Sequence, residues 1–536
     1  MIYTNIEEEY GDYLRDESRL HGKADSISFP RNTRDILSVL ARVRERNMPL
    51  TIQGGRTGIS AGAVPLGGHI LNLSRMNRIL ALGRKGENGP FLLTVQPGLV
   101  LEELRTALAD KRFQTENWDR EALRVLGPFL EAGPVFFPPD PTETSATLGG
   151  MVACNASGAC SFHYGPTRNF IEGLEVVLAD GSLVQLKRGQ TRAEGRDFSL
   201  PRTGAPPLKG TLPAYELPNV KNASGYHSAE DMDLVDLFIG SEGTLGIISG
   251  IVCRLHPAPG QVTGITAFFQ EEKQALHFVR LLRDDHSPSS FKDSGHGEES
   301  RDRDPRLPRA IEFFDSHALK LLDKKNHGSS LAALPPVPPG CSAAVYVEYH
   351  TRDALEAEEA LQVFSGFLEE SGGDLDLTWM ADSDKNIDHL KGLRHAVPEA
   401  VNLLIDERRK QYPELTKLGT DMAVPDDRLE WVFDLYRSDL KSSGLEYVMF
   451  GHVGNNHIHV NILPRDMGEY EEGRKLYEQW GRRVVGVGGS VSAEHGIGKL
   501  KKSLLKEMYG EEGIDAMRRL KQLFDPEGML NPGNLF

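Results

Sequence analysis

Cysteine is scarce in this sequence, which contains four in 536 residues. Cys154, Cys160, Cys253 and Cys341 form no C-x-x-C pair. Closely spaced cysteines are what an iron–sulfur cluster or a thiol redox centre requires of a chain. The scarcity therefore argues against such a centre held by this chain alone, and we expect ordinary thiols of the core or the surface.

Long apolar runs and an excess of positive charge are also lacking. No stretch approaches the ~20 apolar residues of a membrane span, and the acidic residues 1–9 contain no apolar core of a signal peptide. The net charge of -16 opposes nonspecific binding to nucleic acid or anionic lipid. We therefore expect a cytoplasmic protein with no integral membrane segment and no nucleic-acid partner, in which locally placed cations meet any anionic substrate.

The composition is otherwise that of a folded protein with more than one domain. Hydrophobic residues make up 39% and charged residues 26% of the chain, which is ordinary for globular proteins. The length predicts two or three domains. Short apolar strands alternate with segments of helical periodicity, and this alternation predicts an α+β or α/β architecture.

Several elements are predicted individually. Asn32 or Thr33 caps a helix, and Leu50-Thr51-Ile52 forms a strand. The same patterns predict strands over 92–95 and 343–347, a strand pair within 174–186, and helices over 101–108, 276–282, 470–485 and 503–523. Residues 189–218 are rich in Pro, Gly and Arg, and residues 286–308 are dense in Ser, Asp and Arg without an apolar period, so both segments are expected to be surface loops. The composition shift at His256-Pro257-Ala258-Pro259 predicts the first domain boundary.

A glycine-rich loop, Gln53-Gly54-Gly55-Arg56-Thr57-Gly58, directly follows the first of these strands. Glycines in this position let successive backbone N–H groups converge on an anion. The loop has neither the Gly-Lys-Ser/Thr end of a Walker A motif nor the spacing of a Rossmann fingerprint. Taken alone, it suits a phosphate cradle and a tight structural turn equally well.

Two further clusters of small residues change this balance. One comprises Pro138-Pro139-Asp140-Pro141-Thr142 and the segment 148–158, and the other is the segment 240–248. Three such clusters spread over about 200 residues indicate one extended cofactor that lies against the backbone, because chance turns would not share this composition.

A histidine-rich segment occurs late in the chain. His452, His457 and His459 lie within eight residues, and Glu494 and His495 follow later beside glycines. Side chains alternate on a strand, so His457, His459 and Asn461 are expected on one face, with His452 folding back from the preceding loop. Imidazoles with one carboxylate suit Zn²⁺ or Mn²⁺ with a position left open for substrate. For any single histidine, a hydrogen-bonded place at a domain seam is the alternative.

In order and spacing, these motifs resemble the vanillyl-alcohol-oxidase and p-cresol-methylhydroxylase (PCMH) superfamily, in its D-lactate, glycolate and D-2-hydroxyglutarate dehydrogenase branch. The similarity extends from Asp16-Glu17-Ser18 to Asn531-Pro532-Gly533. It implies an α+β fold of three parts. We expect a two-subdomain FAD-binding domain of the PCMH type over 1–256, an α+β cap domain with an antiparallel sheet over 257–465, and a C-terminal helical segment over 466–536 that closes over the flavin.

The resemblance also implies where the FAD is bound. Some relatives attach the flavin through a histidine of the first loop, but this chain has Arg56 and no histidine there, so non-covalent FAD is expected. The implied contacts, which come from all three clusters, are Gln53, Gly54, Gly55, Arg56, Thr57, Gly58, Pro139, Asp140, Pro141, Thr142, Gly149, Gly150, Asn155, Ser157, Gly158 and Ile248.

For the catalytic centre, the resemblance assigns His452, His459 and Glu494 as ligands of a divalent metal, Zn or Mn. It makes Asn461 a substrate contact and His495 the catalytic base. The branch usually has Asp-Gly-Asn where this chain has Asn455-Asn456-His457, which leaves the loop shape open and makes His457 a candidate additional ligand.

A hydroxy acid also needs a partner for its carboxylate, and Arg394 in a Leu-Arg motif is the candidate. Relatives that accept dicarboxylates tend to carry a lysine two residues before Asp421, where this chain has Gly419. This difference favours a short substrate such as D-lactate over 2-hydroxyglutarate, although Lys417 keeps the question open.

The expected function is FAD-dependent oxidation of a small D-2-hydroxy acid to the 2-oxo acid, with hydride transfer to flavin N5. The alternatives are the flavin subunit of a glycolate-oxidase-like complex, a D-2-hydroxyglutarate dehydrogenase, and a transferase similar to alkyl-dihydroxyacetonephosphate synthase. The electron acceptor is not evident, and an iron–sulfur or electron-transfer protein would bring the chain to the membrane periphery. Homodimer formation stays open.

Overall fold

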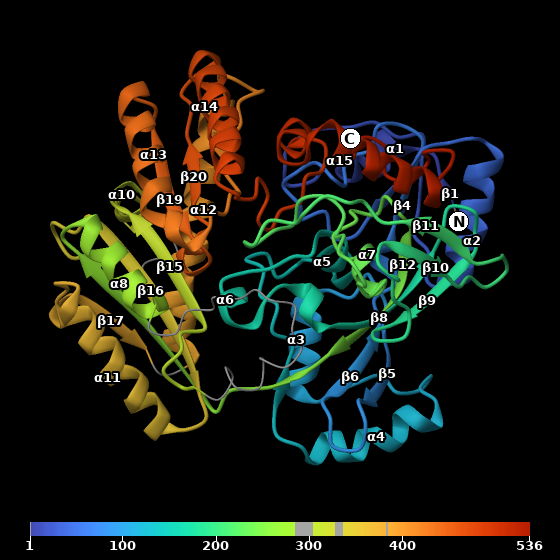
Figure 1. The fold of residues 1–536 in the computed structure, drawn as a ribbon, viewed down its shortest axis with the longest axis horizontal. Helices are drawn as coiled ribbons and strands as arrows, with labels where there is room; N and C mark the ends of the chain where they lie inside the picture. Colours follow the sequence, from blue (N-terminus) through green and yellow to red (C-terminus); the bar gives the residue numbers. More distant parts are fainter. Residues whose placement is uncertain (1, 285–303, 327–335, 382–383) are drawn as a thin grey trace.

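Strand pairing divides the chain into two bodies that stand side by side. The computed structural model describes residues 2–284, 304–326, 336–381 and 384–536. In that part of the chain, residues up to 257 build two larger sheets, and residues 261–462 build a third. Figure 1 shows the N-terminal body on the right, the third sheet with its helices on the left, and the C-terminal helices above both.

The N-terminal body contains a mostly parallel sheet and an antiparallel sheet. The first has the order β1 (Ile2–Tyr3), β2 (Ser26–Ser28), β4 (His69–Asn72), β3 (Leu50–Gln53), with β4 parallel to both neighbours. The second has the order β5 (Ile79–Arg84), β6 (Phe91–Val95), β12 (Ile247–Arg254), β8 (Ile171–Val177), β9 (Leu183–Lys187). The strands predicted from the sequence in this half are therefore confirmed.

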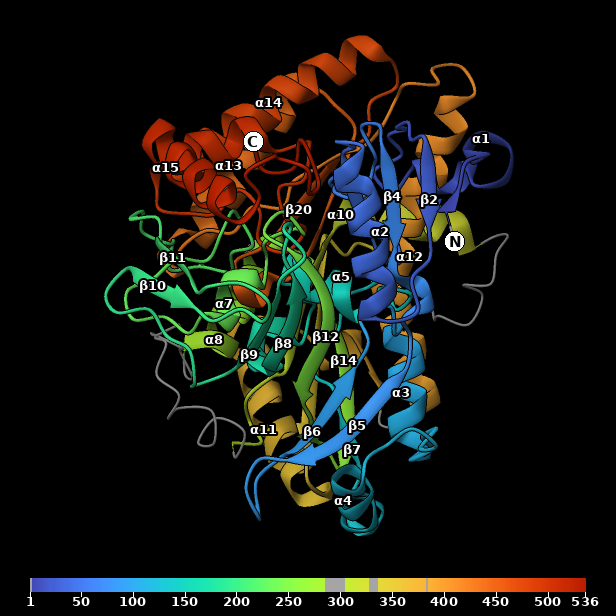
Figure 2. The same cartoon turned by 90° about the vertical axis from the view of Figure 1, so that its right-hand side faces the viewer.

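Helix α2 (Thr33–Glu45) packs against both of these sheets. Its N-cap is Asn32, whose side chain accepts a hydrogen bond from Asp35 N at 3.0 Å, as the sequence predicts. Its buried Leu40 shares one hydrophobic core with Leu71 of β4 and Val177 of β8. Figure 2 shows α2 beside the strands of both sheets.

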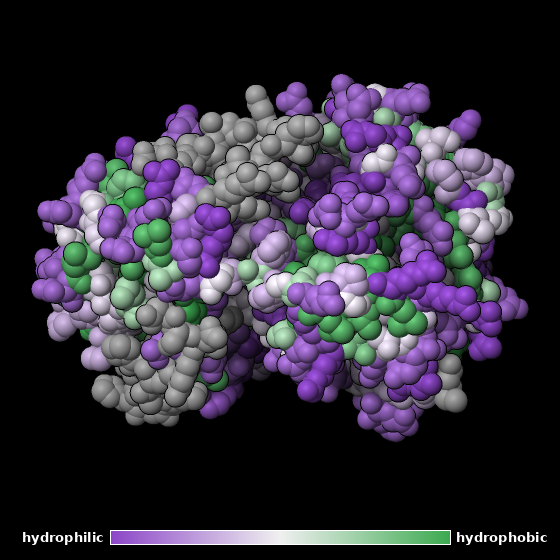
Figure 3. All heavy atoms as spheres, turned by 90° about the horizontal axis from the view of Figure 1, so that it is seen from below, coloured by the Kyte–Doolittle hydropathy of each residue, from purple (hydrophilic) through white to green (hydrophobic). Residues whose placement is uncertain are grey.

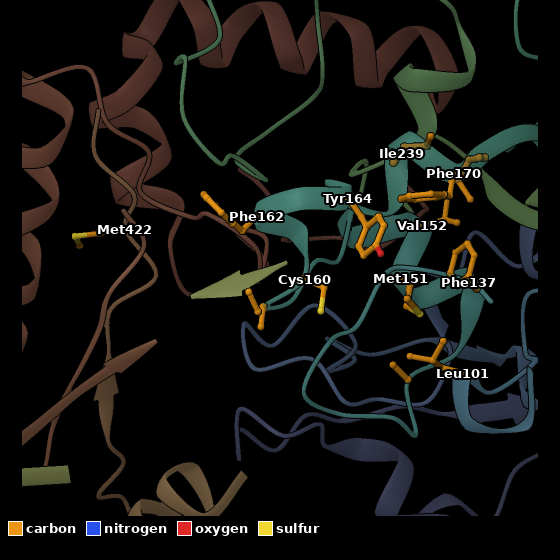
Figure 4. Close-up of a cluster of buried hydrophobic side chains, with 14 of the residues drawn as sticks. Leu101, Phe137, Met151, Val152, Cys160, Phe162, Tyr164, Phe170, Ile239 and Met422 are labelled. Carbon is orange, nitrogen blue, oxygen red and sulfur yellow. The ribbon is translucent and has the colours of Figure 1, made fainter. Parts of the chain in front are cut away.

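The N-terminal body also contains the helices α1 (Ile6–Glu9), α3 (Leu101–Asp110), α4 (Arg120–Glu131), α5 (Leu148–Cys154), α6 (Ser161–Tyr164) and α7 (Val235–Phe238). The buried face of α5 supplies Met151 and Val152, which pack in a core with Leu101 and Phe137 (Figure 4). This packing fixes the helix that carries the second glycine cluster.

The segment 189–218 was expected to be a loop, and this expectation is partly wrong. It contains a hairpin of β10 (Asp197–Leu200) and β11 (Leu208–Thr211). Phe198 and Leu200 alternate with exposed residues and are buried, but two apolar positions among prolines, glycines and arginines are too few to reveal a strand. Most of the other expected loop, 286–308, lies outside the described residues.

The third sheet is antiparallel, as expected. Its order is β17 (Thr378–Ala381), β14 (Gln261–Phe269), β16 (Ala343–Thr351), β15 (Ala310–Asp315), β19 (Tyr447–Gly451), β20 (His459–Ile462), β18 (Leu418–Gly419). The accompanying helices are α8 (Glu272–Asp284), α10 (Ser316–Asn326), α11 (Ala354–Glu370), α12 (Asp384–Arg409) and α13 (Leu429–Ser443).

The C-terminal residues connect both bodies. Helix α14 (Met467–Gly486) packs on β18, and α15 (Lys502–Phe524) returns to the N-terminal body beside β11. After α15, Asn531 receives a hydrogen bond from Ile52 N at 2.7 Å and donates one to Glu242 O at 2.7 Å. None of the described helices is long and apolar enough to cross a bilayer. Among the residues coloured in Figure 3, hydrophilic ones predominate.

Candidate functional site

A cavity of about 820 Å³ lies where the two bodies and the C-terminal residues meet. Its wall contains members of all three glycine clusters and of the histidine segment. The predicted site residues that line it are Gln53, Gly54, Gly55, Arg56, Thr57, Gly58, Pro141, Thr142, Gly149, Gly150, Ser157, Ile248, Arg394, His452, His459, Asn461, Glu494 and His495. Residues as far apart in the sequence as Gln53 and His495 thus face one space, as the long-range cofactor and substrate predictions require.

Four predicted cofactor contacts do not line this cavity, namely Pro139, Asp140, Asn155 and Gly158. A Cβ on Gly158 would lie 2.0 Å from Asp140 O, so this glycine is needed for close backbone packing. Asp140 accepts a hydrogen bond from Cys160 N at 3.1 Å, and Asn155 accepts one from Arg168 N at 3.0 Å. In the structure, these residues support the cavity wall from behind.

The first glycine loop is held against the start of α5. A Cβ on Gly54 would lie 2.2 Å from Thr147 Oγ1, and Gly55 N donates to that same oxygen at 3.3 Å. At Gly58, by contrast, a Cβ would meet no atom within 4 Å. Packing explains Gly54, whereas Gly58 leaves bare backbone facing the cavity, which suits the close approach of a ligand phosphate.

Arg56 turns away from the centre of this loop. Its φ is 62°, its guanidinium lies 4.4 Å from the ring centroid of Tyr13, and it donates a hydrogen bond to Asp12 O. The side chain that stands where some relatives attach flavin therefore anchors the loop to the N-terminal segment.

His452 is placed between two buried carboxylates. Its Nδ1 lies 2.7 Å from Glu312 Oε1 and its Nε2 lies 3.1 Å from Glu494 Oε1. Burial by itself lowers the pKa of His452, but the two carboxylates raise it to about 9. Glu312, which lines the cavity from β15, was not predicted as a site residue. The sequence feature that could have revealed Glu312 is a carboxylate between the apolar residues of this strand.

His459 and Glu494 are oriented just as firmly. His459 Nδ1 lies 2.8 Å from Thr420 O, which leaves its Nε2 3.4 Å from Glu494 Oε1. Glu494 Oε2 receives hydrogen bonds from Ser157 Oγ at 3.0 Å and Lys221 Nζ at 2.6 Å. Burial raises the pKa of Glu494, but the charges of His452 and Lys221 hold it well below its usual range.

His452, His459 and Glu494 are oriented in the way that the ligands of a divalent cation would be. One nitrogen of His452 and one of His459 turn toward the same oxygen of Glu494, while the other atom of each side chain is engaged elsewhere. Such outer partners fix the tautomer and orientation of metal-binding side chains. His452, His457, His459 and Glu494 each offer a donor atom within 4.8 Å of the others. The donor set therefore fits a metal such as Zn²⁺ or Mn²⁺.

His457 does not line the cavity together with His459 and Asn461, contrary to the alternation argument. Strand β20 begins only at His459, and His457 is fully buried behind the cavity wall. Its Nε2 lies 3.0 Å from Asp421 Oδ1, and its Nδ1 lies 3.4 Å from Lys221 Nζ. The altered loop keeps a sharp turn because Asn456 has a φ of 52°, a left-handed value that asparagine tolerates well.

His495 is the most solvent-accessible member of this group, with 29% of its side chain exposed. Its Nδ1 lies 3.3 Å from Asp421 Oδ2, and its backbone N donates to that oxygen at 3.0 Å. Asp421 also accepts from Lys501 Nζ at 2.7 Å. Burial raises the pKa of Asp421, but the charges of His495 and Lys501 hold it well below its usual range. This anionic residue can therefore orient the imidazole.

Arg394 and Asn461 face the same cavity from different elements. Arg394, on α12, is 8% exposed and lies 3.8 Å from both Asp140 Oδ2 and Glu312 Oε2. Burial alone lowers the pKa of Arg394, but these carboxylates raise it, so the guanidinium is charged. A Cβ on Gly419 would lie 2.9 Å from Asn461 Oδ1, which leaves no room there for a larger side chain without a shift of Asn461.

Glu242 is another residue that sequence reasoning missed. Its carboxylate accepts hydrogen bonds from Ile497 N at 2.6 Å and Gly498 N at 2.8 Å. Ser60 Oγ, beside the first glycine loop, donates to His495 O at 2.8 Å. The first and third glycine clusters thus hold the loop that carries Glu494 and His495, a relation that no local pattern reveals.

Two family models match the chain. One, described as the FAD binding domain, matches residues 24–120 and 121–187. The other, described as the C-terminal domain of FAD linked oxidases, matches residues 303–535. Between them they include the first two glycine clusters and the whole histidine segment.

Individual relatives cover nearly the full length of the chain. D-lactate dehydrogenase of Anaerostipes hadrus is 26% identical over 537 residues, which cover 98% of this chain and 92% of the relative. Mitochondrial D-2-hydroxyglutarate dehydrogenase of Bos taurus is 29% identical over 533 residues, which cover 97% and 78%. A solved structure of alkyldihydroxyacetonephosphate synthase has a TM-score of 0.60 at 16% identity, with 96% of this chain and 77% of that chain covered, which is a likeness of fold.

Proposed function

Because the chain belongs to the FAD-linked oxidases, we propose that it is an FAD-dependent dehydrogenase that oxidises a small D-2-hydroxy acid to the 2-oxo acid. The observation that carries this proposal is the cavity itself. It brings Arg394, Asn461 and His495 into one space with the three glycine clusters. A carboxylate-binding cation, a hydroxyl-binding amide and a base are the groups that this oxidation needs.

We infer that His452, His459 and Glu494 hold a divalent cation, Zn or Mn, and that the glycine clusters hold FAD without a covalent bond. When bound, FAD accepts the hydride and the cation stabilises developing negative charge on the substrate hydroxyl. The support is the mutual orientation of the three side chains and the bare backbone at Gly58.

His495 is proposed to take the hydroxyl proton. Asp421 Oδ2 lies 3.3 Å from His495 Nδ1, so the other ring nitrogen is left to accept the proton. Arg394 grips the substrate carboxylate, since a guanidinium offers parallel donors to two oxygens. Glu312 and Asp140, each 3.8 Å away, hold that guanidinium in place.

The proposed substrate is short, with D-lactate as the reference compound. The space opposite Asn461 at Gly419 carries no cation for a distal carboxylate. Lys417 lies two residues earlier and lines the cavity, so a longer acid such as 2-hydroxyglutarate is the competing substrate.

The proposed division of labour follows the predicted boundaries: 1–256 for FAD, 257–465 for the substrate, and 466–536 to close over the flavin. Electrons then pass to a separate acceptor, an iron–sulfur or electron-transfer protein, because the sequence carries no cysteine cluster. If the purified chain alone reduced an artificial acceptor at full rate, an obligatory partner would be excluded. The proposed location is the cytoplasm, with contact to the membrane only through the acceptor.

The decisive experiment is anaerobic mixing of the purified holoprotein with D- and L-hydroxy acids while the oxidised-flavin absorption is followed. We expect bleaching by the D-isomer of a 2-hydroxy acid only. If no hydroxy acid bleaches flavin that is demonstrably bound, with metal added, the proposed oxidation is wrong. Bleaching by both isomers would refute the stereochemical assignment.

A further inference from the structure

The two oxygens of Glu494 have different surroundings. Oε1 faces His452 at 3.1 Å, His459 at 3.4 Å and His495 at 3.6 Å. Oε2 faces away from the histidines of the cavity wall and receives Lys221 Nζ at 2.6 Å and Ser157 Oγ at 3.0 Å. One oxygen is presented to the proposed metal and the other is already occupied.

Lys221 also reaches His457. Its ammonium lies 3.4 Å from His457 Nδ1, and 6% of the lysine side chain is exposed. Because Nζ contacts both Glu494 Oε2 and His457 Nδ1, it stands where a cation held by those two atoms would stand. Lys221 donates one hydrogen bond to a lone pair of Glu494 Oε2 and another to the lone pair of His457 Nδ1. A lone pair that accepts a hydrogen bond cannot bind a metal ion at the same time.

We propose that Lys221 is a positioning residue that limits the proposed metal to three protein ligands. It restricts Glu494 to one metal-facing oxygen and holds His457 outside the ligand set. The inference rests on the proposed metal site at His452, His459 and Glu494. Its functional consequence is that the cation keeps open positions for the hydroxy acid, which a fourth histidine would fill.

This arrangement has a cost in metal affinity. Like charges repel, and an ammonium a few ångströms from a divalent cation is unfavourable by an amount that exceeds a factor of ten in binding even at an effective dielectric constant of about 20. In the proposed arrangement, Lys221 therefore weakens metal binding but leaves coordination positions open for the substrate.

The test is Lys221→Met in the FAD-bound protein after removal of metal with a chelator. Zn²⁺ affinity is measured by competition with a chromophoric chelator, and Co²⁺ absorption in the visible range reports a change of ligand number. We expect the Zn²⁺ dissociation constant to fall by about tenfold or more and the Co²⁺ spectrum to change. Flavin reduction at saturating metal should slow by about tenfold or more, because the open positions are filled.

Two further variants make the result specific. His457→Asn added to Lys221→Met should restore the wild-type Co²⁺ spectrum, because the released imidazole is then absent. Lys499→Met removes another largely buried lysine, whose Nζ contacts Ala61 O and Asn534 Oδ1 instead, and should leave Zn²⁺ affinity unchanged.

The inference is overturned if Lys221→Met binds Zn²⁺ no more tightly than wild type while FAD remains bound. If Lys221→Met does not fold, His457→Asn alone still tests whether His457 is a metal ligand in the wild-type protein. We expect it to change Zn²⁺ affinity by less than about threefold, and a loss of tenfold or more would make His457 a ligand already and refute the role of Lys221. If wild type bound no Zn²⁺ or Mn²⁺ at all, the proposed metal site itself would be wrong.

Discussion

At the residue scale, the arrangement around His495 depends on one buried carboxylate. Asp421 is fully buried and contacts His495, Lys501 and Ser492 within 3.3 Å. A partner that stays anionic stabilises the protonated imidazole and fixes its ring orientation. The proposed base is therefore oriented by a residue 74 positions away in the sequence.

Replacement of this base gives the first prediction. His495→Asn should slow flavin reduction by the D-hydroxy acid by about 10²–10⁴-fold, the usual contribution of a general base. FAD content and Zn²⁺ affinity should stay at wild-type levels, because the asparagine removes no proposed ligand. Stopped-flow reduction under anaerobic conditions measures the rate, and fast reduction by this variant would refute the assignment of the base.

Lys417 gives a prediction about pH. Burial and the charge of Arg19 lower the pKa of Lys417 to about 8. The ammonium is therefore present at pH 7 and lost as the pH rises through about 8, in contrast to an exposed lysine, which keeps its charge to about 10. If Lys417 serves a distal carboxylate, the ratio of kcat/KM for D-2-hydroxyglutarate to kcat/KM for D-lactate should fall between pH 7 and pH 9.

The matched variant is Lys417→Met. It should abolish this pH dependence of the ratio and lower kcat/KM for the dicarboxylate by about tenfold at pH 7, with D-lactate turnover unchanged. A ratio that keeps its pH dependence in the variant would show that another group senses the second carboxylate.

At the element scale, the glycine loop after β3 combines two kinds of glycine. Gly54 is required by its contact with Thr147, whereas Gly58 has no neighbour that excludes a side chain. The same loop thus contains one glycine required by the packing of two segments and another that lines the cavity and is proposed to contact the ligand. Sequence inspection cannot separate the two, because both are written as glycine.

Replacement by alanine should therefore affect a different property at each of the two glycines. Gly54→Ala should destabilise the FAD-free protein by about 1–3 kcal/mol, because the new Cβ would lie 2.2 Å from Thr147 Oγ1. Gly58→Ala should leave that stability within about 0.5 kcal/mol. It should weaken FAD binding about tenfold, because Gly58 lines the cavity and a methyl group there would hinder close approach of the ligand to its backbone. Thermal unfolding without FAD and fluorescence titration with FAD measure the two effects. Equal FAD affinity of wild type and Gly58→Ala would contradict the ligand role of this glycine.

At the scale of the whole molecule, the site exists only because the chain returns to its beginning. Asn531 bridges Ile52 of β3 and Glu242, and Glu242 in turn holds the backbone of Ile497 and Gly498. The C-terminal residues therefore connect the first glycine loop, the third glycine cluster and the loop of His495 in one network.

Loss of this bridge should destabilise the entire fold. Asn531→Ala removes the partner of the half-buried Ile52 N and leaves Glu242 O with only Asn534 Nδ2 at 3.5 Å. This loss should cost about 2–4 kcal/mol. Urea unfolding measures this change, with exposed Asn117→Ala as the control, which should stay within about 0.5 kcal/mol of wild type. If Asn531→Ala matched the control, the C-terminal bridge would contribute little to stability.

Periodicity and turn chemistry were enough to predict the elements that pack in regular patterns, including α2 with its Asn32 cap and the strands β3, β6 and β16. They missed the hairpin of β10 and β11, whose two buried residues stand among prolines and glycines. They also placed His457 on the wrong face, because alternation applies only within a strand and β20 begins two residues later.

The sequence by itself determined the α+β class and the similarity to FAD-linked oxidases, and it predicted the residue types of the proposed site, since these depend on local composition, spacing and order. Only the tertiary structure decided how those residues act. It placed Glu312 between Arg394 and His452, Asp421 behind His495, and Lys221 on Glu494. Each of these contacts joins buried charges from distant segments, and their energies depend on distance and burial, which no local pattern in a sequence encodes.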